Sequence, residues 1–137
     1  MSGASPSLVA LLLLVSCATS PIDPRTVRLD AEFTLAPGQT AQVEGGGLRV
    51  TFYGVSADSR CPTGVTCVWE GDAVVVLAVR PSGSAASRSE LHTSGRYPAE
   101  AEVGGYRVRL AYLAPLPRAD AAPTPAEYRA TLLVLRK

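Results

Sequence analysis

Apolar and polar residues alternate along most of the chain, and this pattern limits the possible folds more than any other feature of the sequence. The alternation runs from Val27 to Leu35 and returns from Leu48 to Val55 and from Tyr106 to Leu113. Successive side chains of a β-strand point to opposite faces, so each stretch is predicted to be a strand with one buried face. No stretch after the apolar N-terminal segment keeps a helical period for three turns.

Turns rich in glycine and proline separate these strands at regular spacing, for example at Ala36–Gln39 and Gly45–Gly47. About seven or eight short strands with such turns are typical of a β-sandwich. The length of 137 residues leaves room for one domain. We therefore predict an all-β fold over residues 27–137, a single antiparallel β-sandwich, with an immunoglobulin-like arrangement as first choice and a small barrel as second.

The apolar run Val74–Val79 predicts a central strand that is covered on both faces. We expect this strand to begin as early as Cys67. Residues of equal parity share a face of a strand, so Cys67 and Trp69 would both face the core. The opposite face would carry Glu70 and Asp72 near the start of the strand.

Four charged residues close to this point form a candidate binding rim, namely Asp58, Arg60, Glu70 and Asp72. The simplest interpretation gives each a structural role. Asp58 would accept hydrogen bonds from loop amides, and Arg60 would form a salt bridge to Glu70 or Asp72. If function lies in this part of the chain, we expect it at this polar rim.

A short apolar run, Leu8–Val15, ends at Leu14-Val-Ser-Cys17. The tetrapeptide resembles the bacterial lipobox, in which signal peptidase cuts before a lipid-modified cysteine. The resemblance implies a lipoprotein signal peptide at residues 1–16, lipidation of Cys17 and a lipidated tether over residues 17–26. Lysine and arginine are missing from residues 1–7, which departs from the usual pattern. Ala18 follows the cysteine, which by resemblance to the enterobacterial sorting rule favours the outer membrane.

With Cys17 lipidated, the two remaining cysteines are Cys61 and Cys67. Both would lie in an oxidising compartment, where disulfides form and persist. Their close spacing around proline and glycine favours a small-loop disulfide, which stabilises by about 2–2.5 kcal/mol in the chain-entropy model. The alternative is a metal- or redox-handling role for Cys61, Cys67 and His92. One histidine and two cysteines fall short of a closed zinc site, and the spacing is wider than a redox Cys-x-x-Cys.

The stretch Asp58-Ser-Arg-Cys-Pro-Thr-Gly-Val-Thr-Cys-Val-Trp-Glu-Gly71 resembles the signature of a group of small, uncharacterised bacterial envelope proteins, many of them lipoproteins. These proteins share the Asp-Ser-Arg-Cys-Pro run, a second cysteine and a Trp-x-Gly before an apolar strand. The likeness covers most of residues 27–137. It implies a cell-envelope location and no particular activity.

The remaining features argue against several classes of function. The formal net charge is +1, with 13 basic and 12 acidic residues and no basic block, so we expect no nucleic-acid partner. The single histidine, His92, and the absence of a Gly-x-Ser-x-Gly motif make us predict that the protein is not an enzyme and needs no cofactor or metal. We expect a lipid-anchored, non-enzymatic binding or structural module whose partner is a protein, a glycan or a small ligand of the envelope.

Overall fold

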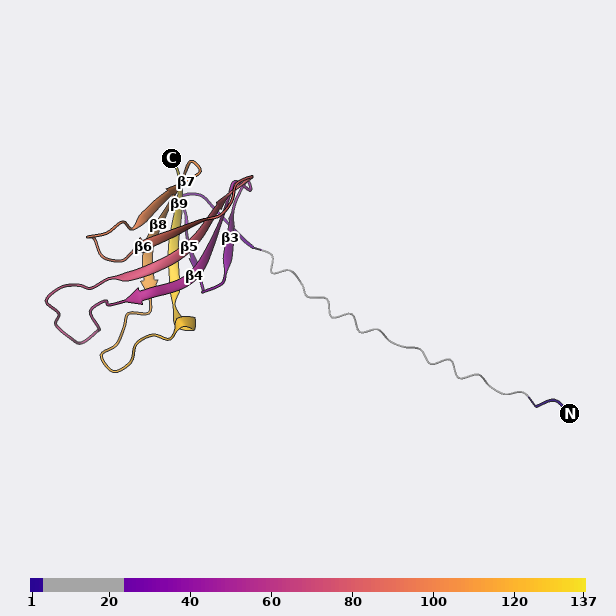
Figure 1. Ribbon diagram of the computed structural model, residues 1–137, viewed down its shortest axis with the longest axis horizontal. Coiled ribbons are helices and arrows are strands. Elements are labelled where there is room, and N and C mark those ends of the chain that lie inside the picture. Colours follow the sequence, from indigo (N-terminus) through magenta and orange to yellow (C-terminus); the bar gives the residue numbers. More distant parts are fainter. Residues whose placement is uncertain (4–23) are drawn as a thin grey trace.

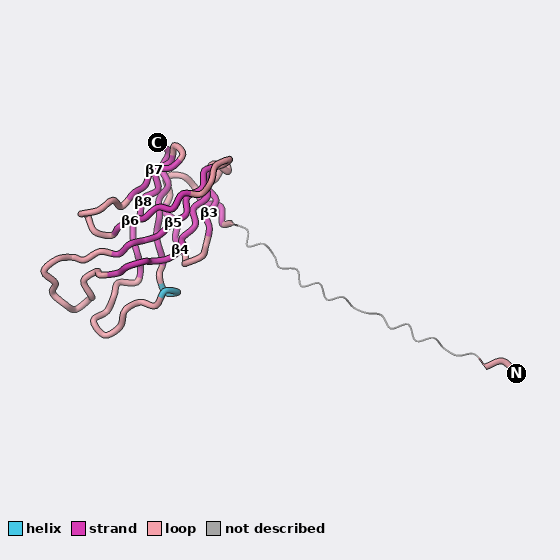
Figure 2. Tube along the Cα trace, viewed as in Figure 1, coloured by secondary structure: helices cyan, strands magenta, loops and turns pink. Residues whose placement is uncertain are grey.

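The computed structural model describes residues 1–3 and 24–137 (Figures 1 and 2). Residues 4–16 of the predicted signal peptide, the predicted lipidation site Cys17 and residues 18–23 of the predicted tether lie outside the described residues. No helix in the described part of the chain has the length and apolar character needed to cross a lipid bilayer.

The described chain folds into two β-sheets that pack against each other (Figure 1). The five-stranded sheet consists of β1 (Arg25–Val27), β3 (Thr40–Val43), β4 (Leu48–Asp58), β5 (Ala73–Pro81) and β6 (Ser87–His92), in that order. The four-stranded sheet consists of β2 (Glu32–Leu35), β9 (Arg129–Arg136), β8 (Tyr106–Ala114) and β7 (Glu100–Val103). One short 3₁₀ helix, η1 (Pro125–Glu127), precedes β9 (Figure 2). The predicted all-β sandwich is confirmed.

The order of strands does not confirm the immunoglobulin-like arrangement. In the first sheet, β3, β4, β5 and β6 are consecutive strands and each pairs with the next. Immunoglobulin domains instead divide their strands as A, B, E, D and C, F, G. The pairing of β1 with β3 is also parallel, whereas every other strand pair in the described residues is antiparallel.

The single strand predicted from Val27 to Leu35 is wrong, because the chain changes sheets within it. β1 pairs with β3 in one sheet and β2 pairs with β9 in the other. Between them Asp30 has a φ of 59°, and its N–H donates to the carbonyl of Val134 at 2.9 Å. Aspartate tolerates this left-handed conformation better than most residues. Alternation continued through the bend, so the pattern alone did not reveal it.

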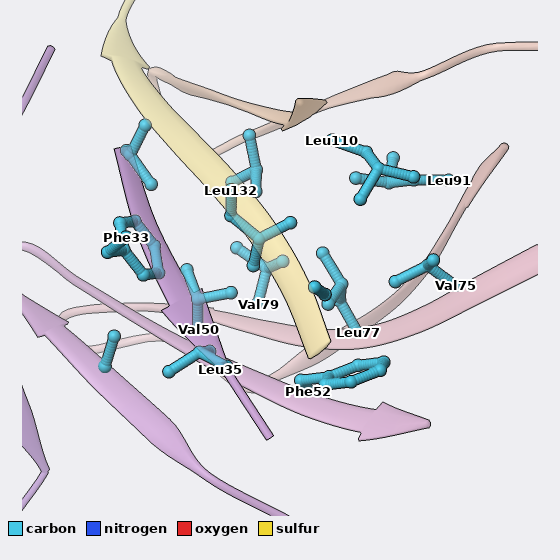
Figure 3. Packing of buried hydrophobic residues seen from close by; sticks show 14 of the residues in the cluster. Phe33, Leu35, Val50, Phe52, Val75, Leu77, Val79, Leu91, Leu110 and Leu132 are labelled. Atoms are coloured by element: carbon cyan, nitrogen blue, oxygen red, sulfur yellow. The ribbon is translucent and has the colours of Figure 1, made fainter. Parts of the chain in front are cut away.

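Side chains from both sheets meet in one hydrophobic core (Figure 3). Strand β5 lies between β4 and β6, and its inward residues Val75, Leu77 and Val79 are fully buried. Val76 and Ala78 on its other face are also buried. The prediction of a central strand covered on both faces is therefore confirmed for this strand. The loop after β4 extends from the side of the domain away from β3, next to which the chain enters (Figure 1).

Candidate functional site

The segment between β4 and β5 is a loop, so the strand predicted to begin at Cys67 is wrong. Two backbone hydrogen bonds extend the hairpin past the strands. The N–H of Ser59 donates to Asp72 at 2.7 Å, and the N–H of Cys61 donates to Glu70 at 2.9 Å. Gly71 interrupts the extended backbone with a φ of +72°, and a Cβ at this position would overlap the carbonyl of Ser59. Glycine is therefore required where the loop returns to β5.

This change of direction places Trp69 at the surface instead of in the core. The side chain of Trp69 is 38% exposed, and its neighbour Val68 is fully exposed. The guanidinium of Arg96 lies over the indole, 5.1 Å from the ring centroid. The prediction that Cys67 and Trp69 share a core-facing side of a strand is wrong, because parity applies only to an unbroken strand.

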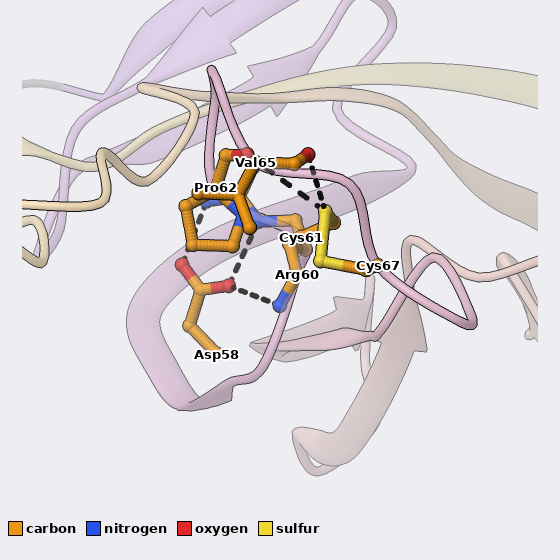
Figure 4. The surroundings of a disulfide bond; sticks show 6 residues. All are labelled: Asp58, Arg60, Cys61, Pro62, Val65 and Cys67. Carbon is orange, nitrogen blue, oxygen red and sulfur yellow. Dashed lines mark hydrogen bonds and ion pairs between the residues drawn. A yellow bond between two sulfur atoms is a disulfide. The ribbon is translucent and has the colours of Figure 1, made fainter.

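Cys61 and Cys67 form a disulfide, as predicted, with their Cα atoms 5.9 Å apart (Figure 4). The bond closes the tip of the loop. Just inside this tip, the N–H of Thr63 donates to the carbonyl of Pro117 at 2.9 Å. The disulfide-closed tip is thereby attached to the segment that follows β8.

Arg60 pairs with Asp58 and not with Glu70 or Asp72, which corrects the predicted salt bridge (Figure 4). The guanidinium donates to both carboxylate oxygens of Asp58, at 2.8 and 2.7 Å. It also donates to the carbonyls of Leu113 and Pro115, each at 2.8 Å. The hydroxyl of Tyr128 completes the group by donating to Asp58 at 2.9 Å. These contacts join the end of β4 to the end of β8 and the start of β9.

Both members of this ion pair are buried, and Arg60 is only 9% exposed. Burial by itself would raise the pKa of Asp58, but the hydrogen bonds from Arg60 and Tyr128 outweigh it, and the pKa lies below its ordinary value. Burial and the hydrogen bond to Asp58 raise the pKa of Tyr128 to about 12. Asp58 and Arg60 are therefore occupied in holding the two sheets together.

Asp72, the third residue of the predicted rim, is also buried, and it holds the end of β6. One carboxylate oxygen lies 2.6 Å from Nδ1 of His92. The other accepts the backbone N–H groups of Thr93, at 3.1 Å, and Ser94, at 3.0 Å. Burial tends to raise the pKa of Asp72. The hydrogen bonds lower it by a larger amount, so the pKa of Asp72 lies below its ordinary value. The ionised carboxylate requires the proton on Nδ1, which leaves Nε2 as an acceptor in the neutral ring.

Sequence reasoning considered His92 as a possible metal-binding or catalytic residue and missed this contact. The antiparallel register places His92 opposite Val74, two residues from Asp72. Only the length of the β5–β6 turn could have revealed the pairing. The fourth rim residue, Glu70, is exposed, and its carboxylate accepts a hydrogen bond of 2.6 Å from the hydroxyl of Ser94. The predicted rim thus divides into three buried residues and one exposed carboxylate.

A pocket of about 310 Å³ opens between the loop, the end of β6 and β8. Glu70 and His92 supply polar groups to its wall, and Leu110, Leu113 and Leu116 supply apolar ones. The sequence did not predict this pocket. Its lining comes from three separate segments, within residues 60–71, 92–99 and 110–116, that only the folding of the sheets brings together.

Exposed large apolar side chains lie in the pocket wall and on the loops that precede and follow its lining residues, and we call this set the apolar rim. Tyr112 and Leu116 line the pocket itself, and the ring of Tyr97 lies 5.0 Å from that of His92. The apolar rim consists of Val65, Val68, Trp69, Tyr97, Tyr112 and Leu116. Elsewhere in the described residues, the large hydrophobic side chains with comparable exposure are Met1 and Tyr53.

Within residues 1–3 and 24–137, no group of three or more His, Cys, Asp or Glu side chains is placed to hold a metal ion. Comparison with protein-family models, curated proteins and solved structures gives no match. The resemblance of the Asp58–Gly71 motif to bacterial envelope proteins therefore stays a prediction.

Replacing Asp58 with Asn should lower the free energy of unfolding by about 3–5 kcal/mol, because Arg60 would be left buried without a counter-charge. Asp120→Asn is the matched control, since it breaks an exposed pair with Arg118 and should cost less than about 1 kcal/mol. Urea unfolding at pH 7 measures both.

Because the pKa of Asp58 is lowered in the folded state, the contribution of the carboxylate to stability is present above pH ~4 and is lost as the pH falls through its folded pKa. Equal effects of the two variants at pH 7 would contradict the role given to Asp58.

Tyr128 should ionise late, at about pH 12, in an alkaline titration followed by tyrosinate absorbance, because burial and the hydrogen bond to Asp58 raise its pKa to about 12. Tyr128→Phe should remove this late step. The pKa is raised on folding, so the stabilisation by Tyr128 is complete below pH ~10 and is lost as the pH rises through about 12. A late step that persists in Tyr128→Phe would show that another tyrosine is responsible.

Removing the disulfide with Cys61→Ser and Cys67→Ser together should destabilise the domain by about 2 kcal/mol, because the loop that it closes is short. Circular dichroism should show a lower melting temperature and an unchanged β-sheet spectrum at 20 °C or any other temperature well below the transition. Loss of the sheet spectrum would mean that the core depends on the disulfide.

Proposed function

We propose that this protein is a lipid-anchored component of the bacterial cell envelope that acts by binding a partner and not by catalysis. The observation that carries the binding role is the pocket with its apolar rim. Large apolar side chains that are exposed together commonly mark interaction sites. Here Tyr112 and Leu116 line a concave site that also contains polar groups, as ligand sites usually do, and the other rim residues lie on the neighbouring loops.

The location is supported by the lipobox-like Leu14-Val-Ser-Cys17 and by the Cys61–Cys67 disulfide. Disulfides persist in oxidising compartments such as the periplasm. Ala18 after the cysteine supports the outer membrane as the destination. The pocket lies on the side of the domain away from β3, beside which the chain enters, so an anchor at Cys17 would leave the pocket free to meet a partner.

Binding is favoured over catalysis by the contacts of the Asp72–His92 pair. Such a pair is the orienting half of an acid–base set and needs a reacting group beside it. The nearby hydroxyl of Ser94 donates to Glu70, and Ser94 is only 1% exposed. In the described part of the chain, no hydroxyl or thiol is hydrogen-bonded to the ring of His92.

A second candidate is a metal- or redox-handling role, which one observation favours: Cys61 and His92 line the same pocket. Reduction of the disulfide would bring a thiol and an imidazole to that wall. Free thiols in protein isolated from the envelope, or copper or zinc bound in a 1:1 ratio, would favour this candidate. A fully oxidised, metal-free protein would favour the binding module.

Replacing Cys17 with Ser should move the protein from the membrane fraction to the soluble fraction, because lipid attachment requires the thiol. Fractionation with immunoblotting measures this. Cys61→Ser is the matched control and should stay with the membranes, since Cys61 pairs with Cys67 and carries no lipid. Membrane retention of Cys17→Ser would contradict the anchoring proposal.

A further inference from the structure

We infer that the pocket receives the lysine or arginine side chain of a protein partner whose apolar residues cover the apolar rim. This inference rests on the proposed binding function and names the kind of partner. It follows from the charge of the pocket, the hydrogen-bonding polarity of its wall and the exposed side chains around it.

The uncompensated charge in the pocket wall is negative. Three side chains that can carry charge near neutral pH line the pocket, namely Arg60, Glu70 and His92. Arg60 is neutralised by Asp58 at 2.7 Å, and His92 is held by Asp72. Glu70 forms no salt bridge with any residue that the structure describes. A cation entering the pocket would therefore gain a charge partner in Glu70, whereas an anion would meet repulsion.

The carboxylate of Glu70 leaves a hydrogen-bond acceptor available in the wall. The hydroxyl of Ser94 occupies Oε1 of Glu70, and no described residue donates to Oε2. A ligand for this wall needs donors, and lysine and arginine carry several donors and no acceptor.

The apolar part of the wall suits the stem of such a side chain. Leu110, Leu113 and Leu116 line the side contributed by β8 and the segment after it. Lysine and arginine bury their methylene groups against apolar surface while the charged end reaches a polar partner. The volume of about 310 Å³ lies at the small end of ligand pockets, which fits one long side chain.

The apolar rim indicates that this side chain belongs to a protein and is not a free amine. Val65 and Val68 project from the disulfide loop into solvent, outside the pocket lining. A small amine within the pocket would leave them uncovered. Tyrosine and tryptophan, which make up three of the six rim residues, are enriched in protein interfaces, and buried anchor side chains surrounded by such a rim are typical of binding hot spots.

The sole tryptophan, Trp69, belongs to this rim and provides an intrinsic fluorescent reporter. The full chain would be titrated with acetyl-Leu-Lys-Leu-amide and with a matched peptide that carries norleucine in place of lysine. The lysine peptide should shift the Trp69 emission and bind at least about tenfold more tightly than the norleucine peptide, a difference of about 1.4 kcal/mol. Calorimetry provides an independent measurement of the two dissociation constants.

Glu70→Gln should reduce this lysine preference to near one. The glutamine oxygen still accepts the hydroxyl of Ser94, so the variant is expected to fold. Glu44→Gln is the matched control and should keep the preference, because Glu44 is exposed at the β3–β4 turn, outside the pocket. Leu116→Ser tests the rim and should weaken both peptides by a similar factor while keeping the ratio between them.

Two further probes, n-butylamine and N-acetylglucosamine oligomers, identify the occupant if the inference fails. Equal affinity for the two peptides, or a lysine preference that survives Glu70→Gln, would overturn the inference. Equally tight binding of n-butylamine would overturn the protein partner in favour of a free amine. Saturable binding of N-acetylglucosamine oligomers without lysine preference would overturn the inference and keep the proposed binding function. No saturable Trp69 response to any of these probes would count against both.

Discussion

The rest of the structure depends on one buried ion pair, between Asp58 and Arg60. Each residue would be costly to bury alone, and together they are stable only because Tyr128 and two backbone carbonyls satisfy the remaining hydrogen-bonding groups. The carbonyls belong to Leu113 and Pro115, at the end of β8, while Asp58 ends β4. The pair therefore joins the two sheets through the ends of β4 and β8.

The candidate site is built on this junction. With Arg60 fixed, the next residue, Cys61, begins the disulfide loop, and the backbone bond from Cys61 to Glu70 sets the position of the exposed carboxylate. Asp72 then orients the end of β6, so His92 forms part of the same wall. Two buried carboxylates thus hold in place the elements that form the pocket, and the third, Glu70, lies exposed in its wall.

Much of the fold could be predicted from the sequence, because alternation and turn residues report local conformation directly. The central position of Val74–Val79 followed from the same local patterns, and the Cys61–Cys67 disulfide followed from the spacing of the cysteines and the expected oxidising compartment. Two errors had one cause: alternation does not show where a strand bends. Asp30 and Gly71 each adopt positive φ: the chain changes sheets at Asp30, and beside Gly71 the side chain of Trp69 leaves the face that parity had assigned to it. The partners of Arg60 and Asp72 depend on strand register and sheet packing, which local patterns do not contain.

The position of β9 has a consequence for when the domain can fold. This last strand lies between β2 and β8, so it holds the second sheet together. Its pairing of Glu32 with Leu133 joins residues from nearly opposite ends of the domain. Contacts so distant in sequence close late and slowly. A chain emerging from the ribosome therefore cannot complete the core until residues 129–136 are available.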